Sequence, residues 1–125
     1  MPRCATTKLR GSMPTSGDVV DLDLGVPEGR EAGFRHPAIL VTAQRILAAE
    51  PSVVHVVPLT TTMRPFNSEI VIEPDDLNGL DAVSAAQCQH LRAVSPRRIL
   101  AVRGNVGAIS LGQLRETIAV ILDLP

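Results

Sequence analysis

Between Asp18 and Ile109 the chain is a succession of short apolar segments rich in β-branched residues, each bounded by Gly, Pro, Asp or Asn. Such segments separated by turn signals are typical of short strands in a barrel or sandwich. The predicted strands lie within 20–24, 37–43, 53–57, 68–73, 82–94 and 103–109. This pattern predicts a mainly β fold: a small, strongly twisted antiparallel sheet of about five to seven strands, closed or nearly so into a barrel.

The last part of the chain has a helical pattern instead. Ser110 and Gln113 have the S-x-x-Q spacing of a capping box. The apolar positions that follow recur at helical spacing, at Leu111, Leu114, Ile118 and Ile121. The sequence therefore predicts a C-terminal amphipathic helix over 110–122, packed on the sheet.

Two further local signals are a turn of helix within 44–50 and a helical turn that begins at Ser95, with Pro96 in its first position. The continuous apolar segment 53–57 predicts a strand buried on both faces, with His55 in the core.

The chain of 125 residues is long enough for one domain. Residues 1–15 carry Arg3, Lys8 and Arg10 without an acid and show no periodicity, so we expect a flexible basic arm. The single folded domain is then expected over 16–125. Neither a signal sequence nor a membrane span is found, so the expected compartment is the cytoplasm, without a membrane partner.

Composition narrows the classes of function. Aromatic residues make up 2% of the chain, with neither Trp nor Tyr, which disfavours a protein that stacks many bases on aromatic platforms. Cys4 and Cys88 form no CxxC pair, and the three histidines lack metal-ligand spacing. We therefore expect no structural disulfide, no metal and no cofactor.

Five segments follow one another in a distinctive order. They are Gly17–Leu24 (GDVVDLDL), Gly29–Val41 (GREAGFRHPAILV), Val56–Thr61 (VVPLTT), Arg64–Ile70 (RPFNSEI) and Gln89–Val94 (QHLRAV). In order and spacing this set resembles the MazF/PemK family, the endoribonuclease toxins of bacterial toxin–antitoxin systems. The resemblance covers about residues 16–125.

The resemblance implies an SH3-like barrel with added helices, usually a homodimer. It also implies metal-independent cleavage of single-stranded RNA at short sequences. In that reaction the ribose 2′-hydroxyl attacks the adjacent phosphate, which leaves a cyclic phosphate and a free 5′-hydroxyl. A further implied partner is a cognate antitoxin with an acidic, partly disordered segment that competes with RNA.

The family pattern also indicates the site. Thr60 matches the Thr of the V-P-x-T turn, and the Arg of the family's R-P pair falls on Arg35 and His36 together. We expect these three residues to be catalytic, with His36 transferring a proton, Arg35 holding the phosphate and Thr60 donating a hydrogen bond. The expected substrate-binding residues are Glu31, Phe34, Arg64, His90 and Arg92.

The chain departs from the family pattern at several positions. Asp21 stands where the opening strand of the family has Trp, and His36 where it has Arg. Gln89 and His90 stand at the acid and Gln positions of the D/E-Q-I/L-R motif. Two alternatives therefore stay open: a gyrase-poisoning toxin of the CcdB type on the same barrel, or a member that binds RNA or antitoxin without cutting.

Overall fold

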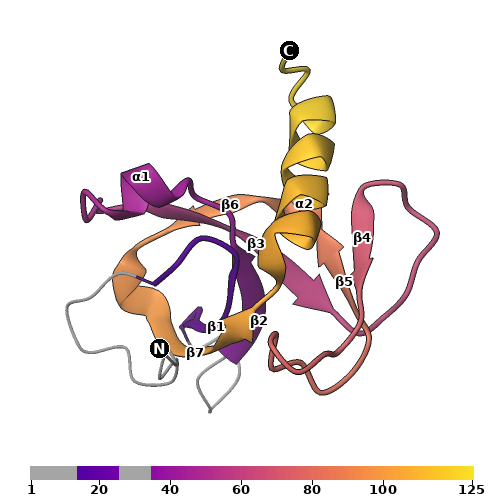
Figure 1. The fold of residues 1–125 in the computed structure, drawn as a ribbon, viewed down its shortest axis with the longest axis horizontal. Coiled ribbons are helices and arrows are strands. Elements are labelled where there is room, and N and C mark those ends of the chain that lie inside the picture. Colours follow the sequence, from indigo (N-terminus) through magenta and orange to yellow (C-terminus); the bar gives the residue numbers. More distant parts are fainter. Residues whose placement is uncertain (1–13, 26–34) are drawn as a thin grey trace.

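The computed structural model describes residues 14–25 and 35–125, and within them the chain forms seven strands. These are β1 (Asp18–Asp23), β2 (Arg35–Leu40), β3 (Val54–Thr60), β4 (Glu69–Ile72), β5 (Ser84–Gln87), β6 (Arg92–Val94) and β7 (Ile99–Asn105). The helical elements are α1 (Gln44–Leu47), the 3₁₀ turns η2 (Cys88–His90) and η3 (Pro96–Arg98), and α2 (Gly107–Ile121). In Figure 1 the sheet curls strongly, and the C-terminal end of α2 projects away from it.

All strand pairs are antiparallel, in the order β4-β5-β3-β2-β1-β7, with β6 paired to β3. The predicted mainly β fold with a C-terminal helix is confirmed, but the expected closure is not reached. In the described part of the chain the end strands β4 and β7 do not pair with each other. The sheet forks at β3, whose residues Val54–Val56 pair with β6 while Leu59 and Thr60 pair with β5. In the described residues neither β6 nor β4, the end strands of the two branches, pairs with β7, so the sheet stays open.

The two faces of the sheet bury separate apolar clusters. One cluster joins strand residues to α2 through Leu111 and Leu114. The other lies on the opposite face, where the curled strands enclose Val20, Leu22, Ala38, Leu40, Leu47, Val54, Val56 and Val94. Because side chains alternate along a strand, each strand contributes to both clusters.

Helix α2 begins at Gly107, so the predicted start at Ser110 is three residues late. The predicted capping box is not formed. Instead Asn105 Oδ1 accepts a hydrogen bond from the Gly107 N–H at 2.8 Å, while Asn105 Nδ2 donates to Asp18 Oδ1 at 3.0 Å. The side chain of Asn105 thus satisfies a free N–H at the start of α2 and connects the helix to β1 by a hydrogen bond. No spacing in the local sequence indicates this role.

Two other local predictions have different outcomes. The helical turn at Ser95 is confirmed, because Ser95 Oγ accepts from the Arg97 N–H at 3.2 Å. The prediction for His55 is wrong: Val54 and Val56 are buried, whereas His55 between them is exposed. Strand alternation turns its side chain away from the cluster that its neighbours enter.

Cys88 begins η2 and is buried in the cluster under α2, with Sγ 4.0 Å from the Leu114 carbonyl oxygen. Burial raises the pKa of this thiol to about 11. Because the thiolate is the reactive form, we expect Cys88 to be inert in the folded protein. In a Cys4→Ser variant, Cys88 is the one remaining thiol. Iodoacetamide at pH 8 should alkylate it at least about tenfold more slowly in buffer than in urea. Equal rates of alkylation would show that η2 opens freely in the folded protein.

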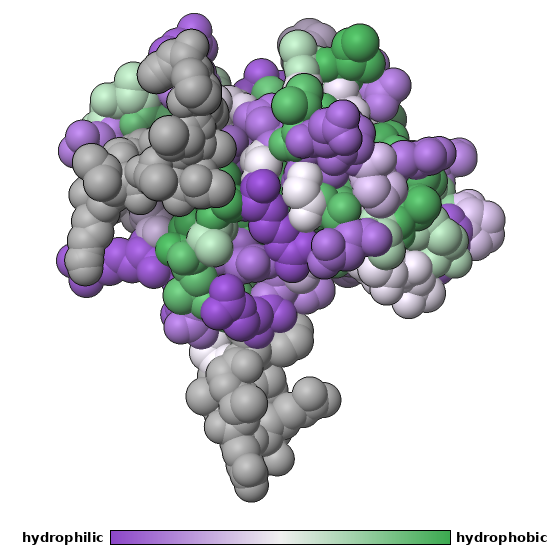
Figure 2. Space-filling model, turned by 60° about the horizontal axis from the view of Figure 1, so that its bottom comes forward, coloured by the Kyte–Doolittle hydropathy of each residue, from purple (hydrophilic) through white to green (hydrophobic). Residues whose placement is uncertain are grey.

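Part of the apolar surface is left uncovered by the fold. The face in Figure 2 shows separate hydrophobic patches with hydrophilic residues between them. On α2, Ile109 is 81% exposed and Val120 is 79% exposed.

These side chains do not belong to a membrane-spanning helix, because no helix in the described ranges is long and apolar enough to span a bilayer. Exposed apolar side chains of this size on one helix are typical of contact surfaces between proteins.

Candidate active site

Strand alternation places Arg35 and His36 on opposite faces of β2. His36 pairs across the sheet with Leu22, a buried residue of β1, and shares its face. Arg35 lies on the other face, where its Nη2 is 3.7 Å from Asp21 Oδ2. Arg103 Nη2 is 3.0 Å from Asp21 Oδ1, so this acid is shared by two guanidinium groups. The predicted partnership of Arg35 and His36 is therefore not assembled in this structure.

The face that carries His36 opens into a pocket of about 450 Å³. Its lining residues lie between positions 22 and 92, and they are four apolar side chains and four polar ones: Leu22, Leu24, His36, Val56, Pro58, Gln87, His90 and Arg92. This size and this mixture are typical of pockets that hold a small ligand. The register of the strands brings these residues together, because His36 pairs with Leu22 and Val56 pairs with Arg92.

The imidazole of His36 is fixed between the sheet and the pocket. Its burial lowers the pKa below the ordinary 6.5, and the charge of Arg92 lowers it further; a hydrogen bond to the backbone of Leu59 acts in the opposite direction. His36 is thus mainly neutral near pH 7. A neutral imidazole that donates from one nitrogen can accept a proton on the other, which is what a general base requires.

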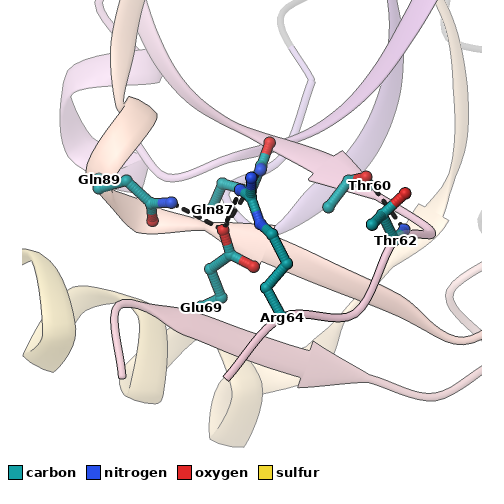
Figure 3. Close-up of polar contacts among 6 residues, drawn as sticks. All are labelled: Thr60, Thr62, Arg64, Glu69, Gln87 and Gln89. Atoms are coloured by element: carbon teal, nitrogen blue, oxygen red, sulfur yellow. Dashed lines mark hydrogen bonds and ion pairs between the residues drawn. The ribbon is translucent and has the colours of Figure 1, made fainter. Parts of the chain in front are cut away.

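Thr60 ends β3 close to the same face. The β2–β3 pairing ends with Ala38 opposite Pro58, and the same register continued by two residues on each strand would bring Thr60 opposite His36. Thr60 is half-buried, and its Oγ1 accepts a hydrogen bond from the Thr62 N–H at 3.1 Å (Figure 3). That bond uses an acceptor position of the hydroxyl, whose proton can still be donated to a ligand.

A buried carboxylate lies behind the pocket and was not expected from the sequence. Glu69 Oε2 accepts hydrogen bonds from Arg64 Nη2 at 2.6 Å, Gln89 Nε2 at 2.7 Å and Gln87 Nε2 at 3.3 Å (Figure 3). The side chain of Glu69 is 1% exposed. Arg64 also lies over the ring of Phe66, 4.9 Å from its centroid. Arg64 therefore holds this cluster together and does not line the pocket, whereas Gln87 belongs to both.

The Glu69 cluster predicts a pH dependence of stability. The hydrogen bond from Arg64 is the main reason that the pKa of Glu69 lies below its ordinary value of 4.5. A carboxylate with a lowered folded-state pKa contributes stability above pH 4.5 and loses it as the pH falls through the lowered value.

Urea unfolding of Glu69→Gln should therefore show a smaller decline in unfolding free energy below pH 4.5 than the wild type shows. Glu116→Gln, which removes an exposed acid of α2, is the matched control. If the two variants decline alike, the ion pair with Arg64 does not contribute to acid sensitivity.

The structure brings together only part of the predicted site. His36, His90 and Arg92 line one pocket, and Thr60 is not among its lining residues but ends β3, the strand that contributes Val56 and Pro58 to it. Arg35 and Arg64 are engaged with carboxylates elsewhere. Glu31 and Phe34 lie outside the described residues. Gln87 and Glu69 were missed; the one sequence signal was the position of Arg64, immediately before a stretch with five acids and no Lys or Arg.

Comparisons with known proteins agree with this architecture. A model of the PemK-like, MazF-like toxins of type II toxin–antitoxin systems matches residues 15–122. The chain is 30% identical over 116 residues to endoribonuclease MazF9 of Mycobacterium tuberculosis (strain ATCC 25618 / H37Rv), which covers 90% of this chain and 98% of that protein.

Solved structures show a shared fold. The MazE–MazF complex (Form II) from Deinococcus radiodurans superposes with a TM-score of 0.73 at 22% identity, over 90% of this chain and 98% of that one. An endoribonuclease in complex with its cognate antitoxin, from a mycobacterial species, superposes with a TM-score of 0.72 at 21% identity, over 90% and 97% of the two chains.

Proposed function

Because the chain belongs to the PemK-like, MazF-like toxins of type II toxin–antitoxin systems, we propose that it is a sequence-selective endoribonuclease that cuts single-stranded RNA without a metal ion. The observation that carries this proposal is the pocket that His36 and Arg92 line together, close enough for the charge of Arg92 to lower the pKa of His36. A neutral imidazole and a nearby cation supply two of the functions that RNA cleavage by its own 2′-hydroxyl requires.

The proposed reaction begins with the RNA phosphate at Arg92. Its planar guanidinium suits the non-bridging oxygens, on which negative charge develops during attack. His36 takes the proton of the 2′-hydroxyl, and the 2′-oxygen forms a bond to phosphorus. Thr60 donates its hydroxyl hydrogen bond to the same phosphate. The bond from phosphorus to the 5′-oxygen then breaks, which leaves a 2′,3′-cyclic phosphate and a 5′-hydroxyl.

Arg35 has a different place in this proposal. Its guanidinium would have to leave Asp21 and pass around β2 to reach a phosphate at His36. We propose that it contacts the RNA chain beyond the pocket, as an exposed cation on the outer face. Phosphate contacts of this kind add affinity that falls as salt rises, without taking part in bond cleavage.

The proposed protein partners follow from the exposed surfaces. We propose that the chain forms a homodimer in the cytoplasm, with the exposed apolar side chains of α2 in protein contacts. We also propose a cognate antitoxin whose acidic, partly disordered segment enters the pocket and displaces RNA, because carboxylates can occupy the position of phosphates at Arg92. If saturating antitoxin and RNA bind together without competition, the shared site is wrong.

The proposed activity can be tested with one long single-stranded RNA. Purified protein in EDTA should cut it at a small set of sequences, and His36→Ala prepared in parallel should cut about 10²–10⁴-fold more slowly, which excludes a contaminating nuclease. Absence of cutting by the wild type with an active MazF toxin as the assay control would overturn the proposal. Trapping of DNA gyrase on DNA in that case would favour the CcdB-type alternative, and RNA binding alone a non-cutting member.

A further inference from the structure

The pocket contains a second histidine that the reaction described above does not use. His90 lines it together with His36 and Arg92. In the proposed reaction His36 is the base and Arg92 is the cation that binds the phosphate. The leaving 5′-oxygen still needs a proton when its bond to phosphorus breaks. An imidazole is the side chain best suited to supply that proton near pH 7.

The fold holds His90 in place from both sides along the chain. Two residues before it, Cys88 is buried under α2, and the Leu91 N–H after it donates to the Cys88 carbonyl oxygen at 3.2 Å. Arg92 then enters β6 and pairs with Val56. The imidazole of His90 is therefore carried by a short anchored turn, at the exposed rim of the pocket and on a different element from His36.

Among the lining residues that the structure describes, these two imidazoles are the groups able to exchange protons. The other lining residues are apolar apart from Gln87 and Arg92, and arginine does not titrate in this pH range. From β4, Glu69 lies behind Gln87, and its carboxylate is bound by Arg64, Gln87 and Gln89. From α2, the residues that share the Cys88 cluster are apolar.

We propose that His90 is the general acid of RNA cleavage and that it works with His36 as the general base, while Arg92 holds the phosphate between them. This inference rests on the proposed function. As the 2′-oxygen binds phosphorus, its proton passes to His36. As the bond from phosphorus to the 5′-oxygen breaks, the proton of His90 passes to that oxygen. His36 then carries the extra proton and His90 lacks one, and exchange with water resets both.

The two histidines to which these roles are given distinguish this chain from the family pattern. At the position of His90 the family motif has Gln, and at the position of His36 it has Arg. His90→Gln therefore introduces the family's own residue and is a mild change at an exposed position. The matched control is His55→Gln, an exposed histidine of β3 that does not line the pocket.

The first readout is the dependence of the cleavage rate on pH. A base must be neutral, so the wild-type rate should fall as the pH drops below the pKa of His36. An acid must be protonated, so acid catalysis predicts a second fall of the rate on the alkaline side. His90→Gln should be about 10²–10⁴-fold slower and should lose the alkaline fall but keep the acidic one. His55→Gln should match the wild type.

The second readout separates acid catalysis from a structural role. After the cut sequence has been mapped, a short RNA is synthesised with sulfur in place of the 5′-oxygen at that bond. A thiolate leaves without protonation, so His90→Gln should cut this substrate within a few fold of the wild-type rate. His36→Gln should stay slow on it, because its 2′-hydroxyl still needs a base.

The outcomes distinguish this inference from the proposed function. If the wild type does not cut the oxygen substrate, the proposed function is wrong. If the wild type cuts but His90→Gln is equally fast, or equally slow on both substrates while its thermal unfolding midpoint is unchanged, His90 is not the acid. If the unfolding midpoint of His90→Gln is lowered, the comparison of the two substrates still tests the role of His90. Partial unfolding slows cleavage of both substrates alike, whereas loss of the acid slows only the oxygen substrate.

Discussion

Replacing His36 by alanine is expected to slow RNA cleavage by about 10²–10⁴-fold, the usual cost of losing a proton-transfer group. The pocket then keeps Arg92 and His90 but lacks a base beside the 2′-hydroxyl. Single-turnover rates on one RNA should show the loss in the chemical step, with RNA binding changed far less. In the wild type the acidic fall of the rate should lie below pH 6.5, because burial and Arg92 lower the pKa of His36.

Two companion variants make this expectation specific. Arg35→Ala should weaken RNA binding in a salt-dependent way and leave the pH profile unchanged, because Arg35 lies with Asp21 on the opposite face. Thr60→Ala should lie between the other two, since one hydrogen bond is worth about 0.5–1.5 kcal/mol and more against developing charge. Near-normal cleavage by His36→Ala with none by Arg35→Ala would mean that the family's catalytic cation sits at Arg35.

Replacing Gly104 by alanine is expected to lower the free energy of unfolding by about 3 kcal/mol, at the upper end of the cost of overpacking. A Cβ at this position of β7 would lie 2.2 Å from the Leu77 carbonyl oxygen and 2.7 Å from the carbonyl carbon of Asn78. Both are backbone atoms, so no side chain can move aside. The strain also falls on the bond in which the Asn105 N–H donates to the Leu77 oxygen at 2.8 Å.

Gly112→Ala in α2 provides the opposite control. Nothing lies within 4 Å of a Cβ at Gly112, and alanine is favoured over glycine in a helix by about 1 kcal/mol. Urea unfolding should therefore show stabilisation of Gly112→Ala alongside destabilisation of Gly104→Ala. Equal stability of the two variants would mean that the loop before Leu80 is not held against β7 as the structure has it.

The presence of the strands and their approximate places along the chain were accessible from sequence, because they depend on local apolar segments and the turns between them. What the sequence did not reveal depends on contacts between distant residues. The start of α2 is set by Asn105 and its bond to Asp18, not by the capping pattern at Ser110. The barrel stays open because neither β4 nor β6 pairs with β7 in the described residues, and such pairing between distant strands has no local signal.

The sequence likewise indicated some residues of the candidate site and not others. His36 and Arg92 reach one pocket, and the resemblance to the family indicated both. Adjacent residues of a strand point to opposite faces, so the alternation of β2 already argued against joint action of Arg35 and His36 on one phosphate. The burial of Glu69 and its hydrogen bonds were not accessible from sequence, because its partners Arg64, Gln87 and Gln89 meet only after β4 and β5 have paired.

The most direct measurement is the mass of the RNA ends that the wild-type protein produces in EDTA. Attack by the 2′-hydroxyl, with His36 as base, leaves a 2′,3′-cyclic phosphate on one fragment and a 5′-hydroxyl on the other. Mass spectrometry of a mapped oligonucleotide should show both, and neither with His36→Ala. Fragments that end in a 3′-hydroxyl and a 5′-phosphate would show that water is the nucleophile and would contradict the role given to this pocket.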